Sequence, residues 1–169
     1  LKQVEDVRDD LIRNRIVVPT GMFQFFKVRS DGNDMVILDD SETTELQRFV
    51  FPRQEGGYQY CLTDFIHPDQ VDVMAFFVVT SGQEVLDYGK ALKDKEQFLA
   101  SHITSAIGLE IAEAFAEYTH QHIRKLWGFP DPEDISLDDI FKLKYRGRRY
   151  SFGYPAWPVL SFQRQLWDL

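Results

Sequence analysis

The sequence has a single cysteine, Cys61, and this scarcity excludes two kinds of structure. Neither an internal disulfide nor a cysteine-based metal site can be built from one thiol, and this is typical of proteins in a reducing cytoplasm. Long apolar runs are also missing: none approaches the roughly 18 residues needed to span a membrane. The first residues are charged rather than typical of a secretion signal. The sequence therefore predicts a cytoplasmic chain that is not inserted in a membrane.

Basic residues are in deficit. The 19 lysines and arginines face 27 aspartates and glutamates, which gives a formal net charge of −8. Binding to nucleic acid requires clustered cations against the phosphates, so this balance argues against a nucleic-acid partner. The acidity would suit a basic protein surface, although solubility alone explains it.

Common catalytic and cofactor-binding signatures are absent as well. There is no glycine-rich dinucleotide loop, P-loop or serine nucleophile elbow. His120 and His122 are two residues apart on an expected helix, so their side chains point about 200° apart, and His102 and His67 lie elsewhere. No metal site is predicted from this spacing. Cys61 lies in an apolar segment and is expected to be an unreactive core residue.

Aromatic residues are plentiful: 14 Phe, 7 Tyr and 3 Trp within 169 residues can fill the core of one domain. The spacing of apolar residues predicts a helix over 2–13, followed by strands over 16–18, 22–28, 35–38, 46–51, 58–65 and 71–80. Helices are predicted over 83–100 and 101–127. A smaller helix within 131–143, capped by Ser136, and a last helix from about 159 complete the prediction. The Ser30–Asp34 cluster between two of these strands is a hairpin signal. Hairpins followed by helices indicate a single α+β domain with a twisted antiparallel sheet and flanking helices.

Two features are not required for folding alone. Asp64 lies between apolar residues at the end of an extended segment, and Arg149 is one of three arginines beside aromatic residues near Gly153. One reading is a turn carboxylate and a solvated basic edge. The other is a pair of charges that clamps a zwitterionic amino acid, with Gly153 allowing a ligand close to the backbone. The residues alone leave both readings open.

Four segments resemble one family. They are Arg48–Gln54 (RFVFPRQ), Cys61–Phe65 (CLTDF), Glu110–Tyr118 followed by His122, Arg124 and Trp127-Gly128, and Tyr145–Ala156 (YRGRRYSFGYPA). In order and spacing, over roughly residues 15–169, the chain is similar to the activation domain at the C-terminus of cobalamin-dependent methionine synthase.

The resemblance implies a place in a methyltransferase. The complete enzyme transfers methyl from methyltetrahydrofolate to homocysteine through cobalamin, which is held mainly by another module. When the cobalamin oxidises to cob(II)alamin, the activation domain binds S-adenosylmethionine against it. An electron from flavodoxin or an equivalent reductase, together with methylation, then restores activity. The implied partners are therefore the cobalamin-binding module and the reductase.

The resemblance also implies roles for particular residues. Asp64 would hold the ammonium of S-adenosylmethionine and Arg149 its carboxylate. The backbone around Ser151 and Gly153 would contact the adenosyl part, and Tyr154 would face the corrin ring.

Other points remain open at this stage. Glu113 lies on the family-like helix, and the sequence fits a solvated or structural role for it at least as well as a ligand contact. Trp157 stands where the family commonly has cysteine, which would alter the local packing or the cobalamin-facing surface. The family continues past residue 169 into strands and a ligand-contacting tyrosine, so an incomplete pocket is expected. The alternatives are a non-catalytic docking module, or a reactivation domain for another corrinoid protein.

Overall fold

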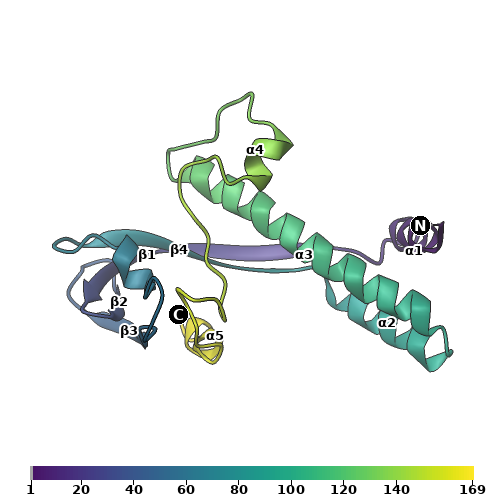
Figure 1. The fold of residues 1–169 in the computed structure, drawn as a ribbon, viewed down its shortest axis with the longest axis horizontal. Helices are drawn as coiled ribbons and strands as arrows, with labels where there is room; N and C mark the ends of the chain where they lie inside the picture. The colour runs from purple at the N-terminus through teal and green to yellow at the C-terminus, as the bar shows by residue number, and fades with distance from the viewer. Residues whose placement is uncertain (1) are drawn as a thin grey trace. The chain divides into compact units, whose positions relative to one another are not determined.

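The computed structural model describes residues 2–169. Its elements in chain order are α1 (Lys2–Arg13), β1 (Thr20–Asp31), β2 (Asp34–Leu38), β3 (Glu45–Val50), the 3₁₀ helix η1 (Leu62–Phe65), β4 (Asp72–Thr80), α2 (Gln83–Asp94), α3 (Phe98–Leu126), α4 (Leu137–Phe141) and α5 (Phe162–Leu166) (Figure 1). The α+β class predicted from the sequence is confirmed.

Contacts divide the chain into two compact units, each made of two segments. The helical unit combines Leu1–Phe23 with Phe77–Arg146, and the sheet unit combines Gln24–Phe76 with Gly147–Leu169. The strands β1 and β4 each contribute residues to both units. All the residues that the sequence analysis proposes for ligand binding, Asp64 and the segment from Arg149 to Tyr154, belong to the sheet unit.

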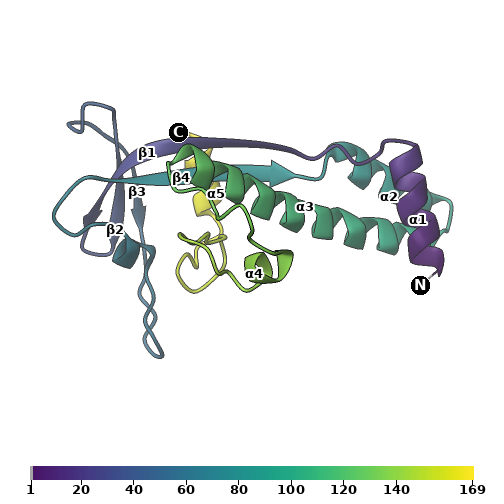
Figure 2. The same cartoon turned by 90° about the horizontal axis from the view of Figure 1, so that it is seen from above.

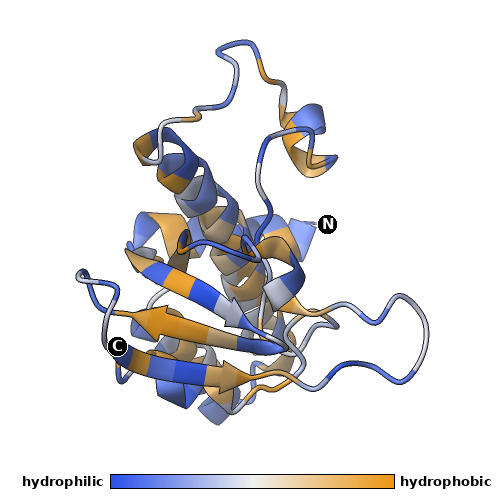
Figure 3. Cartoon of the chain, turned by 90° about the vertical axis from the view of Figure 1, so that its left-hand side faces the viewer, coloured by the Kyte–Doolittle hydropathy of each residue, from blue (hydrophilic) through white to orange (hydrophobic). Residues whose placement is uncertain are grey.

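The strand order is β3-β2-β1-β4, and β2 pairs antiparallel with both β1 and β3. Asp31 lies opposite Asp34, so Gly32 and Asn33 form a two-residue hairpin turn in which Gly32 adopts a φ of +61°. This confirms the turn expected at that point of the sequence. All residues of β2 after Asp34 are buried, and the strand appears in Figure 3 as a largely orange ribbon between its two neighbours. A fully buried strand explains a continuous apolar run without alternation.

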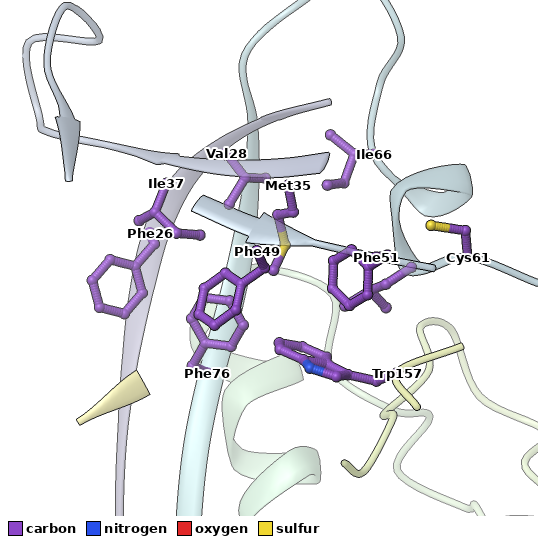
Figure 4. Close-up of a cluster of buried hydrophobic side chains, with 11 residues drawn as sticks. Phe26, Val28, Met35, Ile37, Phe49, Phe51, Cys61, Ile66, Phe76 and Trp157 are labelled. Atoms are coloured by element: carbon purple, nitrogen blue, oxygen red, sulfur yellow. The ribbon is translucent and has the colours of Figure 1, made fainter. Parts of the chain in front are cut away.

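The core of the sheet unit is largely aromatic. Its buried members come from the strands, from η1, from residues that directly flank these elements, and from the segment after residue 147: Phe26, Val28, Met35, Ile37, Phe49, Phe51, Cys61, Leu62, Ile66, Phe76 and Trp157. Figure 4 shows the indole of Trp157 facing the rings contributed by the sheet. Edge-to-face contacts dominate, with ring centroids 5.6 Å apart for Phe49–Trp157 and 5.4 Å for Phe51–Trp157. Such pairs add to the stabilisation from buried area.

In the helical unit, α2 lies alongside α3 and α1 packs against α3 (Figures 1 and 2). Gly108 of α3 allows the two helices to approach, because a Cβ atom there would lie 2.8 Å from Cγ1 of Val85. The Tyr88 hydroxyl of α2 donates a hydrogen bond to Asp10 of α1. Within residues 2–169, no helix is both long and apolar enough to cross a membrane.

The strand predicted over 58–65 is wrong. That segment is a loop that leads into η1. Gly57 and Gln59 adopt φ values of +70° and +50°, which no strand can accommodate. The Asp64 carboxylate also accepts a hydrogen bond from the Cys61 N–H, which favours a helical turn at this point.

Three other boundaries differ from the prediction. The helices α2 and α3 are separated at residues 95–97 rather than at 100–101, because Glu96 adopts a φ of +60°. Residues 16–18 are not a strand, since β1 begins only at Thr20, after Pro19. The last helix begins at Phe162 rather than near residue 159, and it ends at Leu166. The expected cap of α4 is confirmed: the Ser136 hydroxyl accepts a hydrogen bond from the Asp139 N–H at 3.1 Å.

Candidate functional site

Asp64 lies on η1 with its carboxylate paired to Arg53. Nη1 of Arg53 donates to Oδ2 at 3.0 Å and Nη2 donates to Oδ1 at 2.5 Å, which makes the pair bidentate. The N–H of Cys61 donates to Oδ2 at 3.1 Å. The hydrogen bonds from Arg53, and secondarily that from Cys61, hold the pKa of Asp64 below its usual value. The side chain is still 41% exposed, so an ionised carboxylate is accessible from solvent.

Arg53 is anchored on its other edge as well. Its Nε donates to Oδ1 of Asn33 at 2.7 Å, and Nη1 donates to the carbonyl oxygen of Gln59 at 2.9 Å. Arg53 lies within one of the family-like segments, and no role was predicted for it from the sequence. Nothing in its local sequence identifies these partners, because Asn33 lies in the β1–β2 turn, Gln59 in the loop between β3 and η1, and Asp64 in η1.

The segment that contains Arg149 ends in a tight turn. The N–H of Gly153 donates to the carbonyl oxygen of Trp157 and the N–H of Trp157 donates to that of Tyr154, both at 2.8 Å. Gly153 has a φ of +87°, which L side chains rarely adopt, and a Cβ atom there would lie 3.0 Å from Cδ2 of Leu160. Glycine is therefore required by the turn itself, independently of any ligand.

Two contacts join the Asp64 segment to the Arg149 segment. The N–H of Leu62 donates to the carbonyl oxygen of Ala156 at 3.1 Å. The ring of Phe65 packs on the ring of Tyr150, with 4.9 Å between their centroids. Phe65 follows Asp64 and Tyr150 follows Arg149, so residues adjacent in sequence to the acid and to the arginine are in direct contact. The structure therefore brings together the two segments that the sequence analysis paired.

The other predicted site residues differ in exposure. Arg149 is half-buried, whereas Ser151, Gly153 and Tyr154 are exposed at the surface of the same unit. Glu113 is exposed on α3, in the helical unit. These exposures leave the backbone at 151–153 and the Tyr154 ring accessible to a ligand.

Trp157 is buried in the core. Its side chain is only 3% exposed and contacts the rings of Phe49, Phe51 and Phe152. The sequence left open whether Trp157 affects the local packing or the exposed surface, and the structure shows that it affects the packing. The residue fills the interior beneath the turn and is not part of its exposed surface.

Sequence reasoning missed a buried charge cluster in the helical unit. Arg124 of α3 is 1% exposed and forms two hydrogen bonds with Asp131, Nε to Oδ1 at 2.8 Å and Nη2 to Oδ2 at 2.5 Å. Its guanidinium carbon lies 3.7 Å from the centroid of the Tyr145 ring, and Nη1 lies 2.6 Å from Nδ1 of His120. The hydrogen bonds from Arg124 lower the pKa of Asp131. This cluster ties the end of α3 to the loop before α4.

The histidines of α3 have separate environments. His120 is buried beside Arg124, whereas His122 packs edge-on against Phe23 with 6.0 Å between ring centroids. Among residues 2–169, no group of three or more histidine, cysteine, aspartate or glutamate side chains could hold a metal ion.

A solved structure shares this arrangement. The crystal structure of the MetH reactivation domain bound to AdoHcy superposes with a TM-score of 0.87 at 29% sequence identity, and the match covers 99% of this chain and 55% of that chain. The open antiparallel sheet with its helices is therefore a fold of the reactivation-domain class.

The family model described as "Vitamin B12 dependent methionine synthase, activation domain" matches residues 2–169, and the chain belongs to that family. Two curated relatives, the methionine synthases of Mycobacterium tuberculosis and Mycobacterium leprae, are each 34% identical, over 165 and 163 residues. Each match covers 88% of this chain and 14% of the relative. The resemblance inferred from the four sequence segments is confirmed.

Proposed function

We propose that this chain binds S-adenosylmethionine and, as the activation domain of a cobalamin-dependent methionine synthase, supports reductive methylation of cob(II)alamin. The observation that carries the proposal is the junction of the Asp64 and Arg149 segments through Leu62–Ala156 and Phe65–Tyr150. The related reactivation domain, bound to AdoHcy in its crystal structure, supports the same class of ligand.

The amino-acid end of the ligand fits the charges on these two segments. Among residues 2–169, Oδ1 of Asp64 accepts a hydrogen bond only from Arg53, and the side chain is partly exposed, so an ammonium group can reach it. The guanidinium of Arg149, on the adjoining segment, matches a carboxylate in planar, bidentate geometry. An acid and an arginine on adjoining segments provide one partner for each charge of a zwitterion.

The remainder of the ligand would lie against the exposed turn. The backbone at Ser151 and Gly153 would contact the adenosyl part, and the exposed Tyr154 would face the corrin ring. Cobalamin, held mainly by another module of the enzyme, would supply the cobalt that accepts the electron and the methyl group. The partners are then the cobalamin-binding module and flavodoxin or an equivalent reductase, and the proposed location is the cytoplasm.

Calorimetric titration with S-adenosylmethionine and S-adenosylhomocysteine tests the binding site. We expect Asp64→Asn and Arg149→Gln each to weaken binding, the latter by about 2 to 5 kcal/mol if its pair with the carboxylate is well desolvated. Matched controls are Asp69→Asn and Arg148→Gln, at neighbouring exposed positions, which should bind as the wild type does.

Two results would contradict the proposal. Equal affinity of the wild type, Asp64→Asn and Arg149→Gln would show that the ligand binds elsewhere. A wild-type chain that associates with a cobalamin-binding module but binds neither ligand would indicate a docking module instead. Unchanged affinity of the two control variants would show that a loss of binding is specific to Asp64 and Arg149.

A further inference from the structure

We infer that Arg53 is a positioning residue for the ligand's amino group, because it fixes the Asp64 carboxylate in the orientation that receives an ammonium. The inference rests on the proposed function, since it concerns the same site. It assigns a role to a residue that would not itself contact the ligand.

The guanidinium of Arg53 is held independently of Asp64. Its Nε donates to the side chain of Asn33 and one Nη1 hydrogen goes to the carbonyl oxygen of Gln59, at 2.7 and 2.9 Å. Both partners are neutral, so they fix the position of the cation without neutralising it. Two of the three remaining N–H donors, one on Nη1 and one on Nη2, point at Asp64 and form a rigid fork.

The two hydrogen bonds from Arg53 help to determine which carboxylate oxygen of Asp64 can accept a further hydrogen bond. Oδ2 of Asp64 already accepts two hydrogen bonds, from Arg53 and from the Cys61 N–H, whereas Oδ1 accepts one. A carboxylate has about four acceptor positions, so the main unused capacity lies on Oδ1. With 41% of the side chain exposed, this capacity is available to an incoming N–H donor.

The alternative role for Arg53 is to compete with the ligand's ammonium for the Asp64 carboxylate, and this role fits the geometry less well. A competing guanidinium would have to move away when the ammonium binds, but the bonds to Asn33 and Gln59 hold the guanidinium in place independently of the ligand. Arg53 also keeps Asp64 ionised, because its hydrogen bonds lower the pKa of that carboxyl. Positioning and ionisation both favour binding of a cation at the open oxygen.

Affinity for S-adenosylhomocysteine, measured by calorimetry, separates the two roles. We expect Arg53→Gln to weaken binding about tenfold, the scale of one charge-assisted hydrogen bond. Arg53→Lys should fall between this variant and the wild type, because it restores the charge without the fork. Arg48→Gln is the matched control: Arg48 pairs with Asp31, Asp34 and Glu45 of the same sheet and should not affect affinity. Tighter binding by Arg53→Gln would overturn the inference.

A double-mutant cycle with Asp64→Asn tests whether Arg53 acts through Asp64. In that background we expect Arg53→Gln to cause almost no further loss. An equal loss in both backgrounds would show a general structural role and overturn the inference. If Asp64→Asn alone binds as the wild type does, the proposed site fails instead, so the two failures are distinguishable.

The pH dependence provides a readout that a structural defect would not reproduce. Binding needs the Asp64 carboxylate, and its lowered pKa in the wild type lets affinity persist through the pH range in which an ordinary aspartate becomes protonated. In Arg53→Gln the pKa should return toward its usual value, so affinity should begin to fall at a higher pH. Identical profiles for the two proteins would overturn the inference. Circular dichroism at each pH verifies that both remain folded.

Discussion

The N–H of Leu62 donates a hydrogen bond to the carbonyl oxygen of Ala156, with 3.1 Å between the two atoms. Leu62 begins η1 and Ala156 lies in the turn after Arg149, so the two candidate binding segments are joined by their backbones. The bond joins two backbone atoms and involves neither charged side chain. We therefore expect the segments to stay joined in Arg149→Gln, so that a loss of ligand affinity in this variant reports on the charge.

Trp157 should be a major contributor to stability. Trp157→Ala removes a buried side chain from contacts with Phe49 and Phe51, so we expect a loss of about 3 to 5 kcal/mol in the free energy of unfolding. Urea unfolding followed by fluorescence measures it. Trp167→Ala is the control, because Trp167 is exposed and its removal should have little effect. Equal stability of the two variants would contradict the assigned core position.

The Arg124–Asp131 pair predicts a second large effect. Asp131→Asn leaves a buried guanidinium without its main counter-charge, which should cost about 3 to 5 kcal/mol in unfolding free energy at pH 7. The pKa of Asp131 is lowered on folding, so its contribution is present above the usual aspartate pKa. It is lost as the pH falls through the lower, folded value.

The measurement is thermal unfolding of both proteins between pH 7 and pH 3. The difference between wild type and Asp131→Asn should shrink toward the acidic end. Asp138→Asn, which breaks an exposed pair with Lys142, should change stability little at any pH. A constant difference between wild type and Asp131→Asn across the range would show that the charge is not the cause.

Asp39 should titrate far below an ordinary aspartate. Its carboxylate accepts hydrogen bonds from the Ser41 hydroxyl and from the backbone N–H groups of Thr43 and Thr44. The Ser41 bond is the largest cause of the shift, and together these bonds lower the pKa of Asp39 to about 2. NMR titration of the carboxyl carbon should give that value, and Ser41→Ala should raise it. An unchanged pKa in Ser41→Ala would contradict this origin.

Two helical glycines should respond to alanine with opposite signs. At Gly108 a Cβ atom would lie 2.8 Å from Cγ1 of Val85, so Gly108→Ala should destabilise by about 1 to 3 kcal/mol through overpacking. At Gly89 the nearest atom to such a Cβ is 3.7 Å away, so Gly89→Ala should stabilise by up to about 1 kcal/mol through helix propensity. Unfolding of the pair under identical conditions tests both, and a shared sign would refute the packing assignment.

The sequence was sufficient where local rules decide structure. The Gly32-Asn33 turn between two apolar runs predicted the hairpin, and Ser136 predicted the start of α4. The segment over 58–65 has a strand-like composition, but the carboxylate of Asp64 and positive φ values in the loop determine its conformation. The same carboxylate pairs with Arg53, eleven residues earlier in the chain, and no local pattern encodes that pairing.

The candidate site likewise contains residues that the sequence predicted and residues that it did not. Asp64 and Arg149 were found because acid and arginine are the expected partners of a zwitterion, and family-like segments surround them. The role of Arg53 could not be predicted, because its partners belong to three separate parts of the chain. Arg124 was missed because an arginine on an amphipathic helix normally faces solvent, whereas here a loop acid and an aromatic ring enclose it.

The sheet unit is assembled from two stretches of chain that are separated by the greater part of the helical unit. Residues 147–169 contribute Trp157 to its core and are joined to residues 24–76 by hydrogen bonds and ring contacts rather than by direct chain continuity. The segment that bears Arg149 is thus held in the sheet unit by backbone hydrogen bonds as well as by its side chains. A cut after Arg146 would convert the protein into a two-fragment complex, in which recovery of the fold depends on reassociation and can be followed by adding the C-terminal fragment as a peptide.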